Sequence, residues 1–568
     1  MSGIIGLIGP RSHRASIESI RDASNTHVSF RGTPALWDGE RIVIGAYGSS
    51  HLSVAEDGAS VFACDGRIDG ALPGSMLERS TTTGVNLLQH VLRDFGPQRL
   101  DSLAGDYAVA RFDCIDGLLT LARDAFGLRP LFWARSADVF GFASDPALLL
   151  ALGLVGGGLD ASRVAAYLAL EDFGGEQTAF VGVKRVPGGT WLEVDRQLRS
   201  NSGRWFHPNR LPIAPAQPDP DSALERAIDA SVRSRCGGRR IALALSGGVD
   251  SGAVAVALAR AGIRADCVTS TFPNCPEVSE EAGAQSLADA TGHRWHGAPA
   301  PVVYRIEDLE RLARLTGTPL SFPVAEPLTL LDAAIRTGAE VYLDGEGGEP
   351  LFDAHPVILR DLLRAGRSRE VWRTVRGFRQ HHKTSARRLL SAVAGPIWPN
   401  LARRPPDDRP PWVPGPGVAA KPRYTSDRQR VCESLILRGQ LSLPELWERM
   451  LSSANIEYAS PLLDLRVVQL AMALPPEQRL PISGAKPVLR RVLLGSLSSS
   501  RVKMIFTPYY TSYARSLQRS RPELTSHAKL AARQRLVSSE ELRHATSAMW
   551  ALQAMRLAAL ELWLGMQR

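Results

Sequence analysis

The sequence predicts a mixed α/β chain in two parts, an α+β sandwich followed by a doubly wound parallel sheet with a helical C-terminal part. Three observations predict it. Roughly the first two hundred residues alternate short β-like runs with turns. A proline-rich stretch, His207 to Ser222, then breaks the periodicity. From Arg240 onward strands and helices alternate, which favours a parallel sheet that binds ligands at the carboxyl ends of its strands.

The first domain is expected over 1–210, as two sheets with helices. Its expected strands are apolar runs between turn residues: Gly3 to Ile8, Arg41 to Tyr47, Ser60 to Cys64, Tyr107 to Phe112, Leu118 to Leu121 and Val139 to Ala143. The spacing of apolar residues predicts an amphipathic helix over Thr83 to Phe95.

The second domain is expected over 218–568. Its expected helices are Ala223 to Ser234, Gly252 to Ala259, Glu280 to Thr291 and the closing alanine- and leucine-rich Ala545 to Met566. Strands are expected ahead of Ser246, over Ala265 to Thr271 and over Glu340 to Leu343. A basic, proline-rich insert is expected at about 355–427, with a loop over Arg403 to Gly417.

Composition excludes several classes of protein. The 568 residues are too many for one hydrophobic core, and 44% hydrophobic residues indicate a globular chain. The six cysteines form no CxxC pair and have no histidine at metal-binding spacing, which argues against a zinc site or a disulfide framework. Neither a signal peptide nor an apolar run of about 18 residues is evident, so we expect a cytoplasmic protein without membrane contact.

The net charge of +9 is unevenly distributed. Much of the excess lies between Arg360 and Arg409, where arginines and Lys383 outnumber the acids. Because the excess is local, we do not expect a nucleic-acid partner. This segment is either a solvated helical face or a docking surface for an acidic or peptide partner.

The most informative stretch is "LALSGGVDS", Leu243 to Ser251. An apolar strand leads into two glycines, two serine hydroxyls and a carboxylate, and a helix follows. Backbone amides at such a helix start can surround a pyrophosphate, and the carboxylate of Asp250 can hold Mg²⁺ against it. We therefore predict ATP and Mg²⁺ as ligands. The predicted nucleotide-binding residues are Leu245, Ser246, Gly247, Gly248, Val249, Asp250, Ser251, Ser270 and Gly345.

A second glycine cluster, "YLDGEGGEPLF" (Tyr342 to Phe352), also follows an apolar strand. If the two strands are neighbours, Glu346 or Glu349 can face Asp250 across the phosphates. We assign the metal to Asp250 and Glu349 and expect Glu346 to act in catalysis, although either glutamate can complete the metal site. An acidic surface turn is the alternative.

The chain resembles the asparagine-synthetase family in several motifs. Ser246 to Ser251 matches the family's ATP loop. Four further segments match its other hallmarks: "ARDAFGLRPLFW" (Ala122 to Trp133), "FASDPALL" (Phe142 to Leu149), "IEYASPLLD" (Ile456 to Asp464) and "SGAKPVLRR" (Ser483 to Arg491), together with "VPGG" (Val186 to Gly189). The resemblance implies an Ntn-type αββα sandwich, similar to a glutaminase, followed by a PP-loop ATP pyrophosphatase domain.

The resemblance also implies the chemistry. A carboxylate attacks the α-phosphate of ATP, pyrophosphate leaves, and an amine then displaces AMP. Lys503, in "RVKMIFTP", matches the lysine that the family uses near the end of the domain, and we expect it to be catalytic. Lys486 and Arg490, four residues apart on one expected helix face, are weaker candidates for the same work.

The chain departs from the glutamine-hydrolysing members of the family. It begins Met1-Ser2-Gly3 where they begin Met-Cys-Gly, it has Asp65-Gly66-Arg67 for their Asn-Gly-Glu, and His51-Leu52-Ser53 lacks their arginine. Because nucleophile and glutamine clamp are changed together, we expect a first domain without glutaminase activity and no ammonia tunnel.

An amine other than ammonia is then expected. The resemblance offers lasso-peptide cyclases, which join a peptide's N-terminal amine to an Asp or Glu side chain, and β-lactam synthetases. The latter carry a tyrosine where this chain has Glu346, and the basic insert with "RPPW" (Arg409 to Trp412) resembles the cyclases. We favour a lasso-peptide cyclase with a precursor peptide as substrate and a leader-binding protein and leader peptidase as partners.

One departure bears on the metal. Where the family has Asp-Glu, this chain has Glu349-Pro350, so the carboxylate is shifted by a methylene and an amide donor is missing.

Two other functions remain as alternatives to the lasso-peptide cyclase. One is a β-lactam synthetase or other small-molecule amide synthetase, and the other is a scaffold that binds a precursor without activating it.

Overall fold

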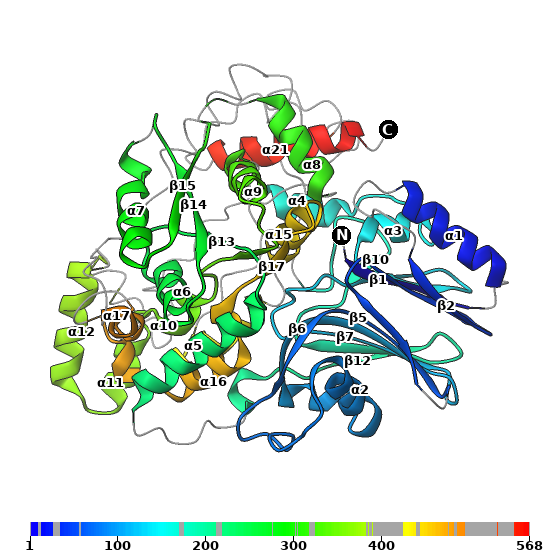
Figure 1. Ribbon diagram of the computed structural model, residues 1–568, viewed down its shortest axis with the longest axis horizontal. Coiled ribbons are helices and arrows are strands. Elements are labelled where there is room, and N and C mark those ends of the chain that lie inside the picture. Colours follow the sequence, from blue (N-terminus) through cyan, green and yellow to red (C-terminus); the bar gives the residue numbers. More distant parts are fainter. Residues whose placement is uncertain are drawn as a thin grey trace.

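The computed structural model describes most of the chain: residues 2–9, 13–26, 34–55, 58–169, 175–211, 219–274, 276–301, 303, 305–316, 324–381, 384–385, 389, 424–438, 443–474, 476–481, 486–494, 531 and 550–566. It has two antiparallel sheets in the N-terminal part and a parallel sheet in the C-terminal part (Figure 1). Among the described helices, none is both long and apolar enough to cross a bilayer.

The N-terminal part is a sandwich of two six-stranded sheets. The first has the order β10-β8-β9-β1-β3-β2 and the second β12-β11-β7-β6-β5-β4. The strands are β1 (Gly3–Ile8), β2 (Ala35–Gly39), β3 (Ile42–Tyr47), β4 (His51–Val54), β5 (Ser60–Ala71), β6 (Leu103–Asp113), β7 (Leu118–Arg123), β8 (Phe132–Arg135), β9 (Phe140–Ala143), β10 (Val183–Arg185), β11 (Thr190–Val194) and β12 (Ser200–Arg204). Every strand expected here is confirmed, and six short ones were missed.

Apolar residues alternate between the two faces of these strands, and this builds the layers. Ile4 and Ile44 of the first sheet meet Val61 and Leu121 of the second in the central core. The outer face of the first sheet packs on α1 (His13–Thr26), α3 (Pro146–Ala151) and α4 (Ala161–Leu168), and that of the second on α2 (Gly84–Asp94). The expected αββα arrangement and the helix after Thr83 are thus confirmed.

The C-terminal part is built on a five-stranded parallel sheet of order β15-β14-β13-β16-β17. Its strands are β13 (Ile241–Ala244), β14 (Ala265–Thr271), β15 (Arg294–Pro299), β16 (Val341–Leu343) and β17 (Glu457–Ala459). β13 to β15 run outward to one side, and β16 then returns to the other side of β13, which makes the sheet doubly wound. The central strands β13 and β16 are buried because helices cover both faces, whereas the edge strand β15 is only partly buried.

Helices cover the parallel sheet on both of its faces. Figure 1 shows α6 and α7 on one side of the sheet and α8, α9 and α15 on the other. The helices are α5 (Pro220–Cys236), α6 (Val249–Arg260), α7 (Glu281–Ala290), α8 (Ile306–Thr316), α9 (Glu326–Arg336), α10 (Gly348–Phe352), α11 (Ile358–Arg364), α12 (Ser368–His381), α14 (Asp427–Arg438), α15 (Leu443–Ser452), α16 (Leu465–Ala473), α17 (Pro487–Leu494) and α21 (Trp550–Met566). Part of the expected insert is therefore helical, while Arg403 to Gly417 lies outside the described residues.

Helix α21 links the two parts of the chain. It contacts α8 and α4, and Trp563 packs against Phe180 with ring centroids 5.6 Å apart. Arg556 donates to the carbonyl of Tyr167 at 2.7 Å, and the Tyr167 hydroxyl donates to the carbonyl of Arg556 at 3.2 Å. The C-terminal helix therefore closes over the N-terminal sandwich, although in sequence it lies at the opposite end of the chain.

Candidate functional site

The two glycine clusters meet at one point of the parallel sheet. β13 pairs with β16 in parallel, with Leu243 opposite Leu343, and on its other side with β14. The strand order reverses between β13 and β16, and in such sheets ligands bind outside the carboxyl ends of the strands at this switch point. The strand before the second cluster is therefore a direct neighbour of the strand before the first, which is the condition for the two clusters to share a site.

The first glycine loop, 245–251, connects β13 to the N-terminus of α6. The Ser246 and Ser251 hydroxyls lie 3.0 Å apart, and the Ser246 amide donates to the Ser251 hydroxyl at 3.2 Å. Gly247 has φ 66°, and a Cβ there would lie 2.9 Å from the amide nitrogen of Ala284 in α7. Only glycine permits this turn and this approach, which place the loop at a helix start, where anions bind.

Glycines also bring the second loop against Asp250. A Cβ on Gly345 would lie 2.5 Å from the amide nitrogen of Ser251, and one on Gly348 would lie 2.2 Å from the Asp250 carboxyl carbon. The missing side chains at these two positions are what allow the loops to touch. Asp250 thus lies between the two clusters.

We expect Gly348→Ala to impair the site more than the fold. The new methyl group would overlap the short Asp250 side chain, which must rotate away, and activity should fall at least about tenfold. The free energy of unfolding should fall by about 1–3 kcal/mol. Gly156→Ala is the matched control, because a Cβ there has no atom within 4 Å. Equal activity of the two variants would contradict the close packing of the loops.

Asp250 is held by a lysine and retains one unused oxygen. Lys486 pairs with its Oδ2, whereas Oδ1 is buried and has no hydrogen-bond partner among the described residues. Burial raises the pKa of Asp250, Lys486 lowers it, and the charges of Asp353 and Glu349 raise it again. A buried carboxylate oxygen without a donor, with further carboxylates nearby, fits a hard divalent cation such as Mg²⁺, which takes one or two protein carboxylates together with phosphate oxygens.

Sequence reasoning missed Asp353. It lies four residues after Glu349, at the end of α10, and its charge affects Asp250 more than that of Glu349 does. Asp353 directly follows α10 in an extended conformation, and its amide donates to the Glu349 carbonyl at 3.2 Å, which keeps the two residues close together. Among the described residues no three acidic, histidine or cysteine side chains are close enough together to hold one ion by themselves, so Asp250 with either Glu349 or Asp353, together with phosphate oxygens, is the arrangement that fits Mg²⁺. Glu346 lies in the same loop, where its amide donates to Asp344 Oδ1 at 3.1 Å.

Two polar clusters support these loops from the neighbouring strands. Asp344, at the end of β16, accepts hydrogen bonds from Tyr458 at 2.7 Å and Ser460 at 2.6 Å. Ser270, at the end of β14, donates to Glu326 in α9, and burial raises the pKa of this glutamate. Ser270 therefore lies at the carboxyl ends of the strands, as predicted. Its hydroxyl is hydrogen-bonded to Glu326, a carboxylate that the sequence did not single out.

The two lysine predictions have different outcomes. Lys503 lies outside the described residues. Lys486 lies just ahead of α17, not on it, so the expectation that Lys486 and Arg490 share a helix face is wrong. Lys486 has φ 52°, a left-handed conformation that is unusual for lysine and tends to persist where function requires it. This backbone directs the ammonium group to Asp250.

The residues at the glutamine-clamp positions form part of the interface between the two parts of the chain. Asp65 accepts a hydrogen bond from the Ser50 hydroxyl at 2.9 Å. Arg67 pairs with Asp69 at 3.0 Å, with Asp106, and with Glu457 of β17 at 3.1 Å. The arginine that replaces the family's glutamate is thus bound by carboxylates from both parts.

Several of the quoted motifs meet at this interface. Arg129 pairs with Glu448 and Glu457, both at 2.7 Å, and Asp145 pairs with Arg449 at 2.6 Å. Arg235 of α5 is fully buried and pairs with three carboxylates: Asp464 at 2.8 Å, Asp106 at 3.1 Å and Asp69 at 3.3 Å. These charged residues therefore join the two parts of the chain, whereas Tyr458 and Ser460 of the same C-terminal segment lie beside the second glycine loop.

The interface gives a pH prediction. Burial raises the pKa of Glu457, but Arg129, Arg67 and Arg239 lower it to about 2, from 4.5 in an unfolded chain. Its contribution, roughly 3 kcal/mol, is therefore present above about pH 4.5 and is lost as the pH falls towards 2. Glu457→Gln should destabilise the protein at pH 7 and have little effect near pH 2. Denaturant unfolding across this range measures it, and a pH-independent difference would contradict the assignment.

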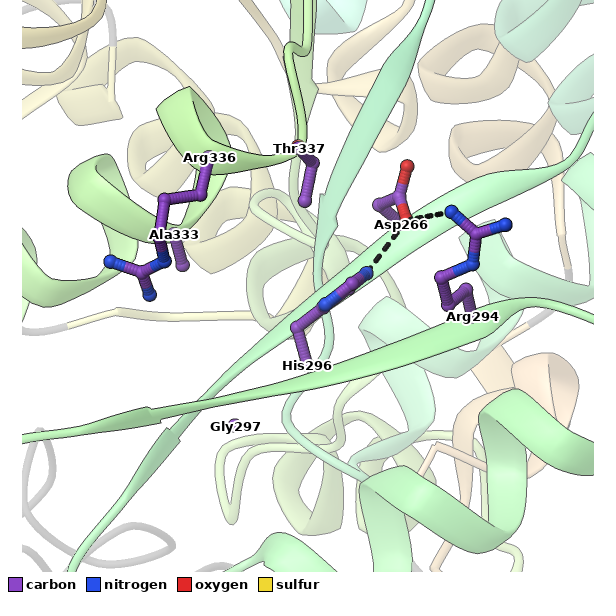
Figure 2. A pocket seen from close by; sticks show the side chains of 7 residues that line it. All are labelled: Asp266, Arg294, His296, Gly297, Ala333, Arg336 and Thr337. Atoms are coloured by element: carbon purple, nitrogen blue, oxygen red, sulfur yellow. Dashed lines mark hydrogen bonds and ion pairs between the residues drawn. The ribbon is translucent and has the colours of Figure 1, made fainter.

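A cavity of about 350 Å³ lies at the amino ends of the strands of the parallel sheet, near the start of β14 and β15 and the end of α9. In Figure 2, Asp266 is bound by His296 at 2.6 Å and Arg294 at 3.6 Å, and Arg336 extends away from them. Because these residues lie at the amino ends of the strands, the cavity is separate from the glycine loops.

Comparison with known proteins agrees with this geometry. The family model "Asparagine synthase" matches residues 223–565, and "Glutamine amidotransferase domain" matches 68–206. A putative glutamine-hydrolysing asparagine synthetase of Mycobacterium tuberculosis (strain H37Rv) is 27% identical over 361 residues, 61% of this chain and 52% of the relative. Asparagine synthetase 2 of Bacillus subtilis is 23% identical over 566 residues, 90% of this chain and 71% of the relative.

The chain spans about half the length of the mycobacterial relatives, 52% of each. A solved glutamine phosphoribosylpyrophosphate amidotransferase of B. subtilis is 13% identical, with a TM-score of 0.21 over 52% of this chain and 65% of that one. The "Asparagine synthase" model alone matches more than half of this chain, including both glycine loops and the lysine beside Asp250. The chain belongs to the asparagine synthase family.

Proposed function

We propose that this protein is an ATP-dependent lasso-peptide cyclase. It would adenylate an Asp or Glu side chain of a precursor peptide and couple it to the peptide's own N-terminal amine. The carboxylate oxygen attacks the α-phosphorus and pyrophosphate leaves. The amine then attacks the acyl carbon, AMP leaves, and the amine loses a proton. Family membership, the paired glycine loops and the carboxylates beside Asp250 support the ATP-dependent step.

The chain's own residues can do most of this work. The amides and hydroxyls of 246–251 would bind the leaving pyrophosphate, and donors fixed before the reaction stabilise developing charge. Lys486 would add positive charge beside Asp250, and Lys503 remains our candidate for the reacting centre. Asp250 with Glu349 or Asp353 would hold Mg²⁺, which when bound neutralises phosphate charge.

The observation that carries the choice of amine is the ion pairing of Arg67. In the family's glutamine-hydrolysing members this position helps to clamp glutamine, whereas here Arg67 is bound to Asp69, Asp106 and Glu457. A guanidinium engaged by three carboxylates is not available to hold an amino acid. Without ammonia from glutamine, the amine has to come with the substrate. A leader-binding protein and a leader peptidase are the partners we propose.

A pyrophosphate-release assay tests the proposal. The pure protein with its partners, ATP and Mg²⁺ is given a peptide with a free N-terminus and one internal Asp. We expect pyrophosphate release and a product lighter by one water. The same peptide with Asn for Asp should give neither result, and an N-acetylated peptide should give no ring.

Three results would overturn the proposal. Conversion of aspartate to asparagine with free glutamine would restore the glutaminase interpretation. Release driven only by small carboxylates would favour a small-molecule amide synthetase, and no substrate-dependent release at all would favour a non-catalytic scaffold.

A further inference from the structure

Helix α12 is strongly amphipathic and follows the second glycine loop through α10 and α11. Its inner face, Val371, Val375 and Phe378, packs on an apolar cluster that includes Ile358 and Leu362 of α11. Thr374, between them, is fully buried. This packing fixes which side of α12 faces outward, and Figure 1 shows α12 at the margin of the molecule.

The outer face of α12 is basic and carries an exposed aromatic ring. Its residues recur at helical spacing: Arg369, Trp372, Arg373, Arg376 and Arg379. Trp372 is 63% exposed, and the Arg376 guanidinium lies 5.7 Å from the centroid of its ring. Contact of this apolar ring with water is unfavourable, and a partner that covers the ring would gain binding free energy from removing it from water. Tryptophan and arginine are also the residues enriched in the contact regions of protein interfaces.

The described residues offer this face little counter-charge: the pKa of Glu370 is lowered by its own backbone amide, by Arg367 and, more weakly, by the charge of Arg373. None of them forms an ion pair with Arg369, Arg373, Arg376 or Arg379, and the one acid of α12, Glu370, pairs with Arg367 at 3.2 Å. The chain's own segment 382–423 is also basic, since its arginines and lysines far outnumber its two acids, Asp407 and Asp408. The complementary charge is therefore expected from another molecule.

We propose that the outer face of α12, Arg369 to Arg379, is the docking surface for an acidic segment of a peptide. The inference rests on the proposed function, because it assigns this segment to the peptide substrate outside the ring-forming residues. The face is about 15 Å long, which matches about five residues of an extended peptide. Nucleic-acid modules generally bury about 600 Å² or more of protein surface, so a single helix face of this length favours a peptide.

Fluorescence anisotropy with a labelled peptide tests this surface. The probe is a peptide of alternating Glu and Ala, about ten residues long and so twice the span of the face. We expect the full-length protein to bind it, with an affinity that falls as salt is added. The double variant Arg373→Glu with Arg376→Glu should bind about tenfold or more weakly, and Trp372→Ala measurably more weakly. The same peptide with Gln for Glu should not bind.

A matched control separates the local face from total charge. Arg135→Glu with Arg210→Glu removes the same charge from exposed positions of the N-terminal part and should leave binding unchanged. Equal affinity of wild type and the α12 variant, or an equal loss in the control, would overturn the proposal. So would tighter binding of a single-stranded oligonucleotide of equal charge that is lost in the same α12 variant. Thermal unfolding of each variant checks that the fold is intact.

The two proposals can fail separately. Asp250→Asn leaves α12 untouched and should bind the probe as wild type does. If the probe binds α12 but no peptide drives pyrophosphate release, the cyclase proposal fails and the docking surface stands. If the precursor drives release equally well in wild type and the α12 variant, and the probe does not distinguish them, the docking proposal alone fails.

Discussion

Asp250→Asn is expected to reduce substrate-dependent pyrophosphate release by at least about a hundredfold while leaving the fold intact. The amide keeps the shape of the side chain but removes the negative charge that pairs with Lys486 and that a metal requires. Burial raises the pKa of Asp250, so the charged form is costly to bury, and neutralising it should not lower the melting temperature greatly.

The control is Asp229→Asn. Asp229 lies in α5 and pairs at 2.8 Å with Arg260, at the far end of α6 from the glycine loops. The same chemical change there should leave pyrophosphate release unaltered. Calorimetric titration of Mg²⁺ with an ATP analogue gives a second measurement, in which only the Asp250 variant should lose metal-dependent binding. Full activity of Asp250→Asn would show that the metal site has been misassigned.

Arg235→Met is expected to give the largest loss of stability, about 3–5 kcal/mol. The guanidinium is fully buried and pairs with Asp69, Asp106 and Asp464. The methionine fills similar space, but three buried carboxylates lose a shared counter-charge. The change should also weaken the attachment of the N-terminal sandwich, because Asp69 and Asp106 lie on one side of the interface and Asp464 on the other.

Denaturant unfolding measures this loss. Arg233→Met, two residues earlier on α5, is the matched control, because Arg233 is exposed and, within the described part of the chain, its guanidinium donates only to the carbonyl of Ala261 at 3.3 Å. It should change the free energy of unfolding by no more than about 0.5 kcal/mol. Similar losses in the two variants would mean that the buried charges are compensated without Arg235.

The first glycine loop was predictable because its signals are local. A strand, two glycines, two hydroxyls, a carboxylate and a helix follow one another within Leu243 to Ala259, and the structure has them in that order. Ser270, the penultimate residue of β14, and Gly345, two residues after β16, also lie at the carboxyl ends of strands next to β13.

The partners of Asp250 were harder to predict. Asp353 was missed because it lies just beyond α10, a helix of only five residues that contains a proline, so periodicity gives almost no signal. Lys486 was undervalued because its left-handed backbone, and not its helix position, directs it to Asp250. Both depend on chain segments that are far from the loop in sequence.

The contacts between the two parts of the chain were the least predictable feature. Arg67, Arg129, Arg235 and Glu457 can each be noted in the sequence, but nothing local indicates that they converge, since their separations reach 390 residues. The sequence by itself determined the two kinds of sheet, the order of their main elements and the phosphate-type loop, because periodicity and glycine chemistry act over a few residues. Only the tertiary structure decided which carboxylates surround Asp250 and which charges join the two parts, because those pairs form only where the packing of whole layers brings distant side chains together.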